Sequence, residues 1–161
     1  MRRIFLALVV LAFALNECNA QEKPDLLISE GLQPYVYNYM EAMTADGWSM
    51  KHLLDNDVFI IFDYEIGKDF EERGIVGLAL GMDNDELVYV IINVTAWVSL
   101  TDFEKQDVVN HELMHDIFNI RHTDKLNKSK LMHPSSYPNS WGETTSRLID
   151  VINDLNNVNG Y

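Results

Sequence analysis

Residues 101–122 read TDFEKQDVVNHELMHDIFNIRH, and this stretch has the pattern of a capped, amphipathic helix. Thr101 and Glu104 have the spacing of a capping box, in which each side chain satisfies a free backbone N–H of the first turn. Apolar residues then recur at helical spacing, at Val108, Val109, Leu113, Ile117 and Ile120. This stretch therefore predicts a capped helix that buries one apolar face.

The helix carries the run His111-Glu112-Leu113-Met114-His115. Histidines four residues apart project from one helix face, so both imidazoles can reach one zinc ion. A glutamate beside the first histidine can take a proton from a water held at the zinc as that water attacks a carbonyl. The run therefore predicts a zinc-dependent hydrolase. The alternative is that His111 and His115 are ordinary polar residues on a solvated face.

A catalytic zinc generally has three protein ligands, and His122 is the first candidate for the third. In a continuous helix His122 would lie about 10 Å farther along the axis than His115, because each residue rises about 1.5 Å. Zinc–nitrogen bonds are only about 2 Å long, so the chain must leave the helix before His122 and fold back. Asn119 is the predicted exit residue, because asparagine tolerates the left-handed conformation that ends helices.

Other side chains compete for a place in such a site. Glu143 could be the third ligand, although an acidic residue in the first turn of a helix is favoured by the helix dipole without any metal. His133 or an aspartate is a further alternative. Asp116 and Asp124 could instead accept hydrogen bonds that orient the ligands, or could be plain surface acids.

Outward from this region, hydrophobic periodicity predicts a small number of helices and strands. We expect a helix over residues 35–45, strands over 58–62, 75–80 and 87–98, and a last helix over 141–156, with the third strand bent or split near Asn93. Runs of this kind predict an α+β fold. Its parts would be one twisted mixed sheet of three to four strands, a backing helix, an active-site helix and a C-terminal helix.

Residues 1–20 have the pattern of a secretory signal peptide. Two arginines precede an apolar segment over residues 4–15, and small residues follow up to Ala20. Twelve apolar residues are too few to span a bilayer as a helix. We expect cleavage near Ala20, one domain over residues 21–161, and a secreted or periplasmic location. Lipidation of Cys18, the only cysteine, is the less favoured alternative.

Composition limits the classes of partner. The chain has 161 residues, is 47% hydrophobic and carries a net charge of −13, with no basic patch. An acidic surface disfavours nucleic acid and anionic membranes, and it could attract cationic substrates. We expect a monomer that binds no nucleic acid and has no membrane span.

The motifs together resemble the metzincin class of zinc metallopeptidases, whose pattern is similar to His-Glu-x-x-His-x-x-Gly-x-x-His followed by a turn that contains methionine. Residues 111–115 match its first part directly. Residues 119–122, Asn-Ile-Arg-His, are similar to Gly-x-x-His with one residue inserted before it. Residues 131–134, Leu-Met-His-Pro, are similar to the Leu-Met-x-Pro turn of matrixins. The resemblance covers roughly residues 101–138.

The resemblance implies a zincin-like domain that hydrolyses peptide bonds. His111, His115 and His122 would hold Zn²⁺, Glu112 would be the general base that later passes the proton to the leaving amine, and Met132 would form an apolar floor under the ligands. The substrate would be a peptide or protein, and a separate inhibitor protein could hold the enzyme in check.

Residues 94–98 could then form a strand along the cleft and pair with an extended substrate. Two other functions stay open at this point. One is a catalytically inactive binding protein of the same fold that keeps zinc for stability. The other is an interaction domain without metal.

Overall fold

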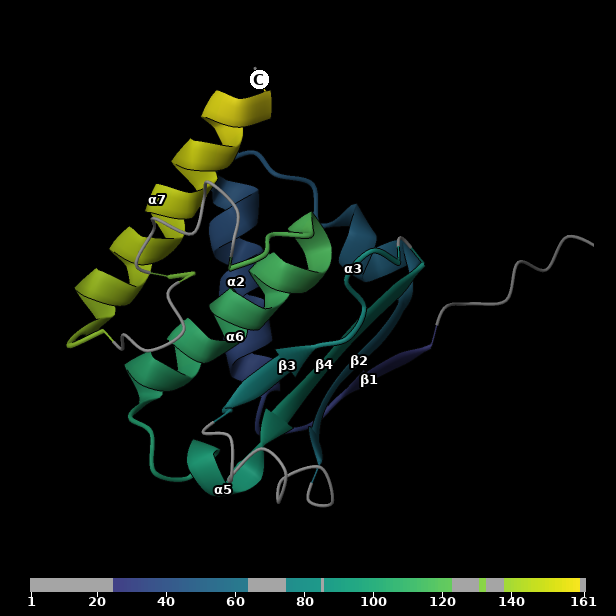
Figure 1. Ribbon diagram of the computed structural model, residues 1–161, viewed down its shortest axis with the longest axis vertical. Helices are drawn as coiled ribbons and strands as arrows, with labels where there is room; N and C mark the ends of the chain where they lie inside the picture. Colours follow the sequence, from purple (N-terminus) through teal and green to yellow (C-terminus); the bar gives the residue numbers. More distant parts are fainter. Residues whose placement is uncertain (1–24, 64–74, 85, 123–130, 133–137, 160–161) are drawn as a thin grey trace, which may run out of the picture.

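The computed structural model describes residues 25–63, 75–84, 86–122, 131–132 and 138–159. These residues form an α+β fold with five helices and one open mixed sheet of four strands (Figure 1). The predicted fold class is therefore confirmed. The predicted signal peptide, the methionine turn beyond Met132, and the alternatives Asp124 and His133 lie outside the described residues.

The sheet has the strand order β1-β2-β4-β3. The strands are β1 (Leu26–Ile28), β2 (Asp57–Asp63), β3 (Gly77–Ala79) and β4 (Leu87–Asn93). The first, second and fourth are parallel, whereas β3 pairs antiparallel with β4 and forms one edge of the sheet. The sheet is therefore mixed, as the sequence predicted.

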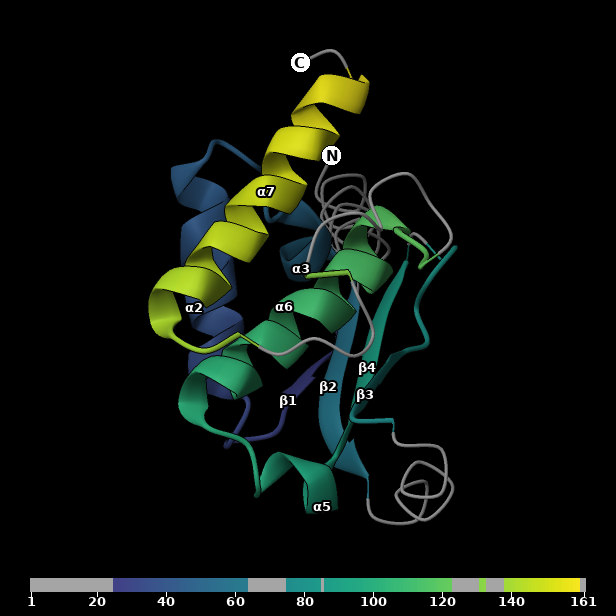
Figure 2. The ribbon, with the colours of Figure 1, turned by 60° about the vertical axis from the view of Figure 1, so that its left-hand side comes forward.

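The helices are α2 (Gln33–Ala45), α3 (Lys51–Asp55), α5 (Val94–Trp97), α6 (Asp102–Phe118) and α7 (Trp141–Asn159). Helix α6 packs against β3 and β4 on one side and against α2 and α7 on the others. Figure 2 shows α2, α6 and α7 gathered on the same side of the sheet. Among the described residues, no helix combines the length and hydrophobicity needed to cross a lipid bilayer.

The hydrophobic core lies between the sheet and these helices. It is formed by side chains that the sequence spaced at helical or alternating intervals, including Val36, Tyr39, Met43, Val88, Val90, Ile92, Val109, Leu113, Val151 and Ile152. Burial of such apolar surface is the main term that stabilises the fold. Helix α6 is packed on several sides. This packing holds in place the side chains that α6 presents to β3 and to residues 131–132.

Most of the predicted helix ends are confirmed, but α2 begins two residues before the predicted Tyr35 and α7 ends three residues after the predicted Asn156. The Thr101 N–H donates to Oε2 of Glu104 at 2.7 Å, and α6 begins at the next residue. Helix α2 ends at Ala45, and Gly47 then takes a φ of 86°, which glycine adopts without strain. Asn119 ends α6 with φ 53° and ψ 30°, the left-handed conformation that the sequence required there.

The predicted strand over residues 87–98 is wrong in its second half. Strand β4 ends at Asn93, whose Oδ1 accepts hydrogen bonds from the N–H groups of Thr95 at 3.0 Å and Ala96 at 3.4 Å. An asparagine at this position starts a helix by satisfying its first free N–H groups, and this local bond outweighs the strand preference of the residues that follow. Residues 94–97 form α5, so they cannot pair with a substrate as a strand.

The sequence did not predict β1 or α3. Strand β1 is only three residues long, and Leu26 is 67% exposed, so no hydrophobic alternation marks it. The strand exists through pairing with distant residues: the Ser29 N–H donates to the Ile60 carbonyl, and the Val58 N–H donates to the Asp25 carbonyl. Such pairing is a tertiary effect that local propensity does not report.

Candidate metal centre

Three histidine side chains meet at the C-terminal end of α6. The Nε2 atoms of His111 and His115 are 2.9 Å apart, and Nε2 of His122 lies 3.0 Å from each of them. Among the described residues, these three are the group of side chains that could hold a metal ion. The left-handed turn at Asn119 makes this possible, because it returns the chain toward the helix face.

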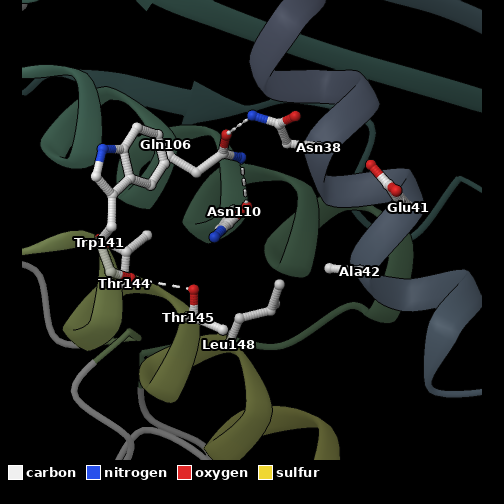
Figure 3. Close-up of a pocket in the computed structure, with 9 residues that line it drawn as sticks. All are labelled: Asn38, Glu41, Ala42, Gln106, Asn110, Trp141, Thr144, Thr145 and Leu148. Carbon is white, nitrogen blue, oxygen red and sulfur yellow. Dashed lines mark hydrogen bonds between the residues drawn. The ribbon is translucent and has the colours of Figure 1, made fainter.

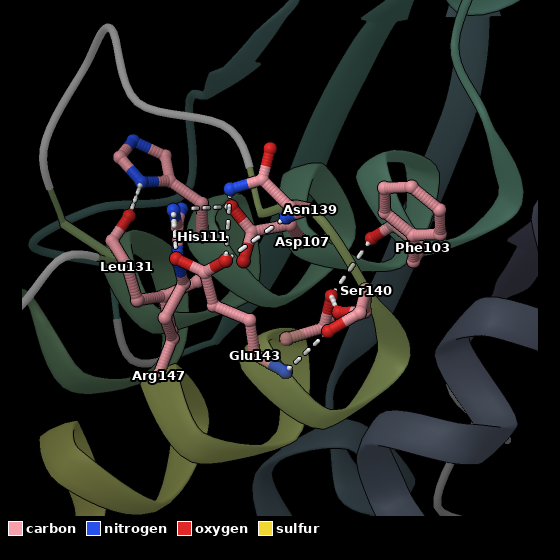
Figure 4. A network of polar contacts seen from close by, with 9 residues as sticks. Phe103, Asp107, His111, Leu131, Asn139, Ser140, Glu143 and Arg147 are labelled. Atoms are coloured by element: carbon pink, nitrogen blue, oxygen red, sulfur yellow. Dashed lines mark hydrogen bonds and ion pairs between the residues drawn. The ribbon is translucent and has the colours of Figure 1, made fainter.

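The hydrogen bonds of Nδ1 fix the tautomers of His111 and His115. Nδ1 of His111 lies 2.6 Å from the Leu131 carbonyl oxygen, as Figure 4 shows, and Nδ1 of His115 contacts the Ile120 carbonyl oxygen. A carbonyl oxygen only accepts hydrogen bonds, so both Nδ1 atoms carry a proton. In a neutral imidazole the lone pair is then on Nε2. The close Nε2 atoms of these two rings are therefore both acceptors and cannot bond to each other.

This arrangement suits a metal cation. A triangle with sides of about 3.0 Å has its corners about 1.7 Å from its centre, so three nitrogens can share one ion at a bond length of about 2.0–2.1 Å. A proton is a poor substitute, because burial and the neighbouring His115 and His122 lower the pKa of His111 to about 3, against the opposing effect of the Leu131 carbonyl. The donor set can hold a metal ion of the kind that imidazole binds.

Glu112 lies beside this group and faces the edge strand β3. Its side chain is buried, with the residue 6% exposed, and the Ala79 N–H donates to its carboxylate. Burial raises the pKa of Glu112 to about 8, Asp116 adds to this rise, and the Ala79 bond opposes it. A Cβ atom at Gly77 would lie 2.7 Å from Cγ and from Oε1 of Glu112. The glycine therefore leaves the space that Glu112 occupies.

Asp116 connects α6 to the β3–β4 hairpin. The residue is 2% exposed, and its Oδ2 accepts hydrogen bonds from the N–H groups of Gly81 at 2.8 Å and Tyr89 at 3.2 Å. Of the two roles left open for Asp116, the plain surface acid is therefore wrong. Asp116 orients the hairpin against the helix that carries the histidines.

The turn of the same hairpin also contacts the segment that leads to His122. Oδ1 of Asn119 accepts a hydrogen bond from the Asp83 N–H at 2.5 Å, and the Arg121 guanidinium forms an ion pair with the Asp83 carboxylate. Asn119 thus supplies both the left-handed conformation and a polar contact that glycine could not make. These contacts across the hairpin were not predicted, because no sequence signal relates residue 83 to residues 119 and 121.

Glu143, the alternative third ligand, has other partners. Its Oε1 accepts a hydrogen bond from Arg147 at 3.1 Å, and its Oε2 accepts one from the Asn139 N–H at 3.0 Å (Figure 4). The Asn139 bond is the largest of the effects that lower the pKa of Glu143. Arg147 is buried and also bonds Asp107 at 3.2 Å. Glu143 therefore orders the start of α7 and is not part of the histidine group.

Met132 is fully buried, and Leu131 beside it supplies the carbonyl that holds His111. Burial of Met132 is compatible with the apolar floor that the metzincin resemblance implies. The role itself stays a prediction, since residues 133–137 lie outside the described part of the chain.

Comparisons with protein-family models, with curated proteins and with solved structures found no match. Function is therefore inferred from the geometry of the three histidines, Glu112 and β3. The resemblance to metzincins stays a prediction made on residues 101–138.

Proposed function

We propose that this protein is a metzincin-like zinc peptidase that hydrolyses peptide bonds with Glu112 as its general base. The observation that carries this proposal is the convergence of three Nε2 atoms within 3.0 Å, with Nδ1 of His111 and His115 held by carbonyl oxygens. Three imidazole ligands with an open fourth position are a common arrangement in catalytic zinc sites. We infer that the metal is zinc because the ligand group consists of imidazoles alone, with neither thiolate nor carboxylate, as in this class of zinc site.

The chemical roles follow from what each side chain can do. Zinc, when bound, supplies the Lewis acidity that polarises the scissile carbonyl and makes a water a good nucleophile near neutral pH. His111, His115 and His122 would hold it. Glu112 would accept the proton of the attacking water and return it to the leaving amine.

The edge strand β3 offers a place for an extended substrate. The Leu80 N–H donates to the Tyr89 carbonyl, and the Asn93 N–H donates to the Val76 carbonyl, so residues 76 and 80 face β4. Backbone groups alternate along an antiparallel strand, and those of Gly77 and Ala79 therefore face away from β4, where the Ala79 N–H already donates to Glu112. A peptide paired with this edge would pass Glu112. This replaces the cleft strand that was expected at residues 94–98.

One observation favours the second candidate, a zinc-stabilised binding protein without activity. The Glu112 carboxylate accepts a hydrogen bond from Ala79, and a structural glutamate that holds β3 against α6 would do the same. This candidate predicts zinc-dependent folding without turnover of any peptide.

The proposal is tested by metal analysis and by a cleavage assay on the purified protein. We expect about one zinc per chain, and we expect EDTA to abolish cleavage of a mixed peptide library and added zinc to restore it. The melting temperature should fall with EDTA, because an ion bound only by the folded state stabilises it. Cleavage that persists after the metal is removed would refute the mechanism. A metal-free protein with unchanged stability in EDTA would indicate the interaction domain instead.

The fit between β3 and the catalytic base can be tested at Gly77. Gly77→Ala should lower kcat/KM by about 10–100-fold, because the new Cβ displaces Glu112 and small misplacements of a catalytic group are costly. Zinc content should stay unchanged, since the histidines are held by other groups. Gly142→Ala is a matched control, because a Cβ there meets only Ser140 Oγ at 3.9 Å. Equal activity of the two variants would mean that Glu112 does not depend on the space beside β3.

A further inference from the structure

A second site lies between α2, α6 and α7, separate from the histidine group. Here a cavity of about 350 Å³ opens between the three helices (Figure 3). Its lining residues include Asn38, Gln106, Asn110, Trp141 and Leu148 and include none of the three histidines or Glu112. Cavities of this size are large enough for a small ligand.

A chain of amide side chains forms the back of this cavity, and its orientation is determined by one backbone group. Gln106 Nε2 donates to the Tyr35 carbonyl at 2.8 Å, and a carbonyl can only accept. The same Nε2 donates to Oδ1 of Asn110 at 2.9 Å, while Oε1 of Gln106 accepts from Asn38 at 3.1 Å. The amide nitrogen of Asn110 is therefore the last donor in this series of hydrogen-bonded side chains.

Asn110 points this nitrogen into the cavity, as Figure 3 shows. The residue is 2% exposed, and its Oδ1 is engaged by Gln106, so the amide nitrogen is the Asn110 atom that can bond a ligand in the cavity. A ligand that covers this N–H donor without offering it an acceptor would leave the donor unsatisfied, so a ligand bound here needs an acceptor atom at this point.

The remaining walls of the cavity offer an apolar surface on one side and hydrogen-bond acceptors on others. Trp141 is 48% exposed and, with Leu148 and Ala42, supplies apolar surface. The Glu41 carboxylate at the opposite side is a pure acceptor. Thr145 donates its hydroxyl proton to the Trp141 carbonyl at 3.0 Å, so its oxygen also presents lone pairs.

We propose that this cavity binds a single pyranose sugar unit, either free or at the end of a glycan. A ligand here must accept from Asn110, donate to Glu41 and Thr145, and place an apolar face near Trp141. Hydroxyl groups both donate and accept, and a pyranose ring carries several of them around a face of C–H groups. A purely apolar ligand would leave Asn110 unsatisfied. A simple cation would satisfy Glu41 alone.

The full-length protein can be tested with methyl glycosides of glucose, galactose, mannose and N-acetylglucosamine. We expect at least one to bind with a Kd of about 0.1–10 mM, measured by saturation-transfer NMR. Trp141→Ala and Asn110→Asp should each weaken binding at least about tenfold, because they remove the apolar wall and the donor. Ile149→Ala is the matched control, since Ile149 is exposed on the same helix and does not line the cavity.

Trp141 is exposed, so its variant is expected to fold even if Asn110→Asp does not. Absence of binding by every glycoside at about 10 mM, or equal binding by wild type and Trp141→Ala, would overturn the proposal. A trisaccharide of the sugar that binds distinguishes the two sources. Tighter binding than the methyl glycoside assigns the end of a glycan, and equal binding assigns a single sugar unit. Glu112→Gln should leave this binding unchanged.

Discussion

Glu112→Gln is expected to lower kcat/KM for peptide cleavage by about 10²–10⁴-fold, the usual contribution of a general base. Glutamine has nearly the shape of glutamate but cannot take up the proton of the attacking water. Zinc content should remain at about one per chain, because Glu112 is not in the group of converging histidines. The Ala79 N–H keeps an acceptor in Oε1 of the glutamine, so the melting temperature should change little.

The measurements are steady-state cleavage, metal content and thermal unfolding on the same preparations. Glu143→Gln is the matched control, since it makes the same change at an acidic residue whose bonds go to Arg147 and Asn139. We expect this control to retain cleavage. A Glu112→Gln variant as active as the wild type would refute the base assignment. Loss of zinc in that variant would assign Glu112 a structural role instead.

His122→Ala should release zinc, with an affinity at least about 100-fold lower than that of the wild type. Loss of groups that only orient a ligand already costs about 10–100-fold, and loss of a ligand should cost more. Cleavage should fall together with zinc content. Competition with a chromogenic chelator measures the affinity directly and does not depend on activity.

Glu143→Ala separates the two candidate third ligands. This variant should keep its zinc and lose thermal stability, because buried Arg147 would retain only the Asp107 partner of the two ion pairs shown in Figure 4. Zinc loss in Glu143→Ala with zinc retained in His122→Ala would overturn the ligand assignment and the metzincin resemblance. Retention of zinc in both variants would place the third ligand elsewhere in the chain.

Local sequence rules were sufficient for most helix ends and for the relation between the first two histidines. The 3.6-residue helical period places His111 and His115 on one face, and short-range bonds produce the cap at Thr101. The need for a chain reversal before His122 followed from bond lengths, and the left-handed Asn119 confirms it. The wrong prediction of a strand over residues 94–98 also has a local cause. The Asn93 side chain starts a helix there, although the apolar residues that follow favour a strand.

The sequence by itself determined the α+β class, the capped helix and the residues that carry the proposed chemistry, because these depend on periods and caps a few residues long. Only the tertiary structure decided which distant groups contact these residues and orient their side chains. The Leu131 carbonyl fixes the His111 tautomer from 20 residues away, and Asp83 and Gly81 contact Asn119 and Asp116 across 36 and 35 residues. Such contacts form only after the sheet and α6 have packed together, and no local pattern specifies which backbone groups will then face each other.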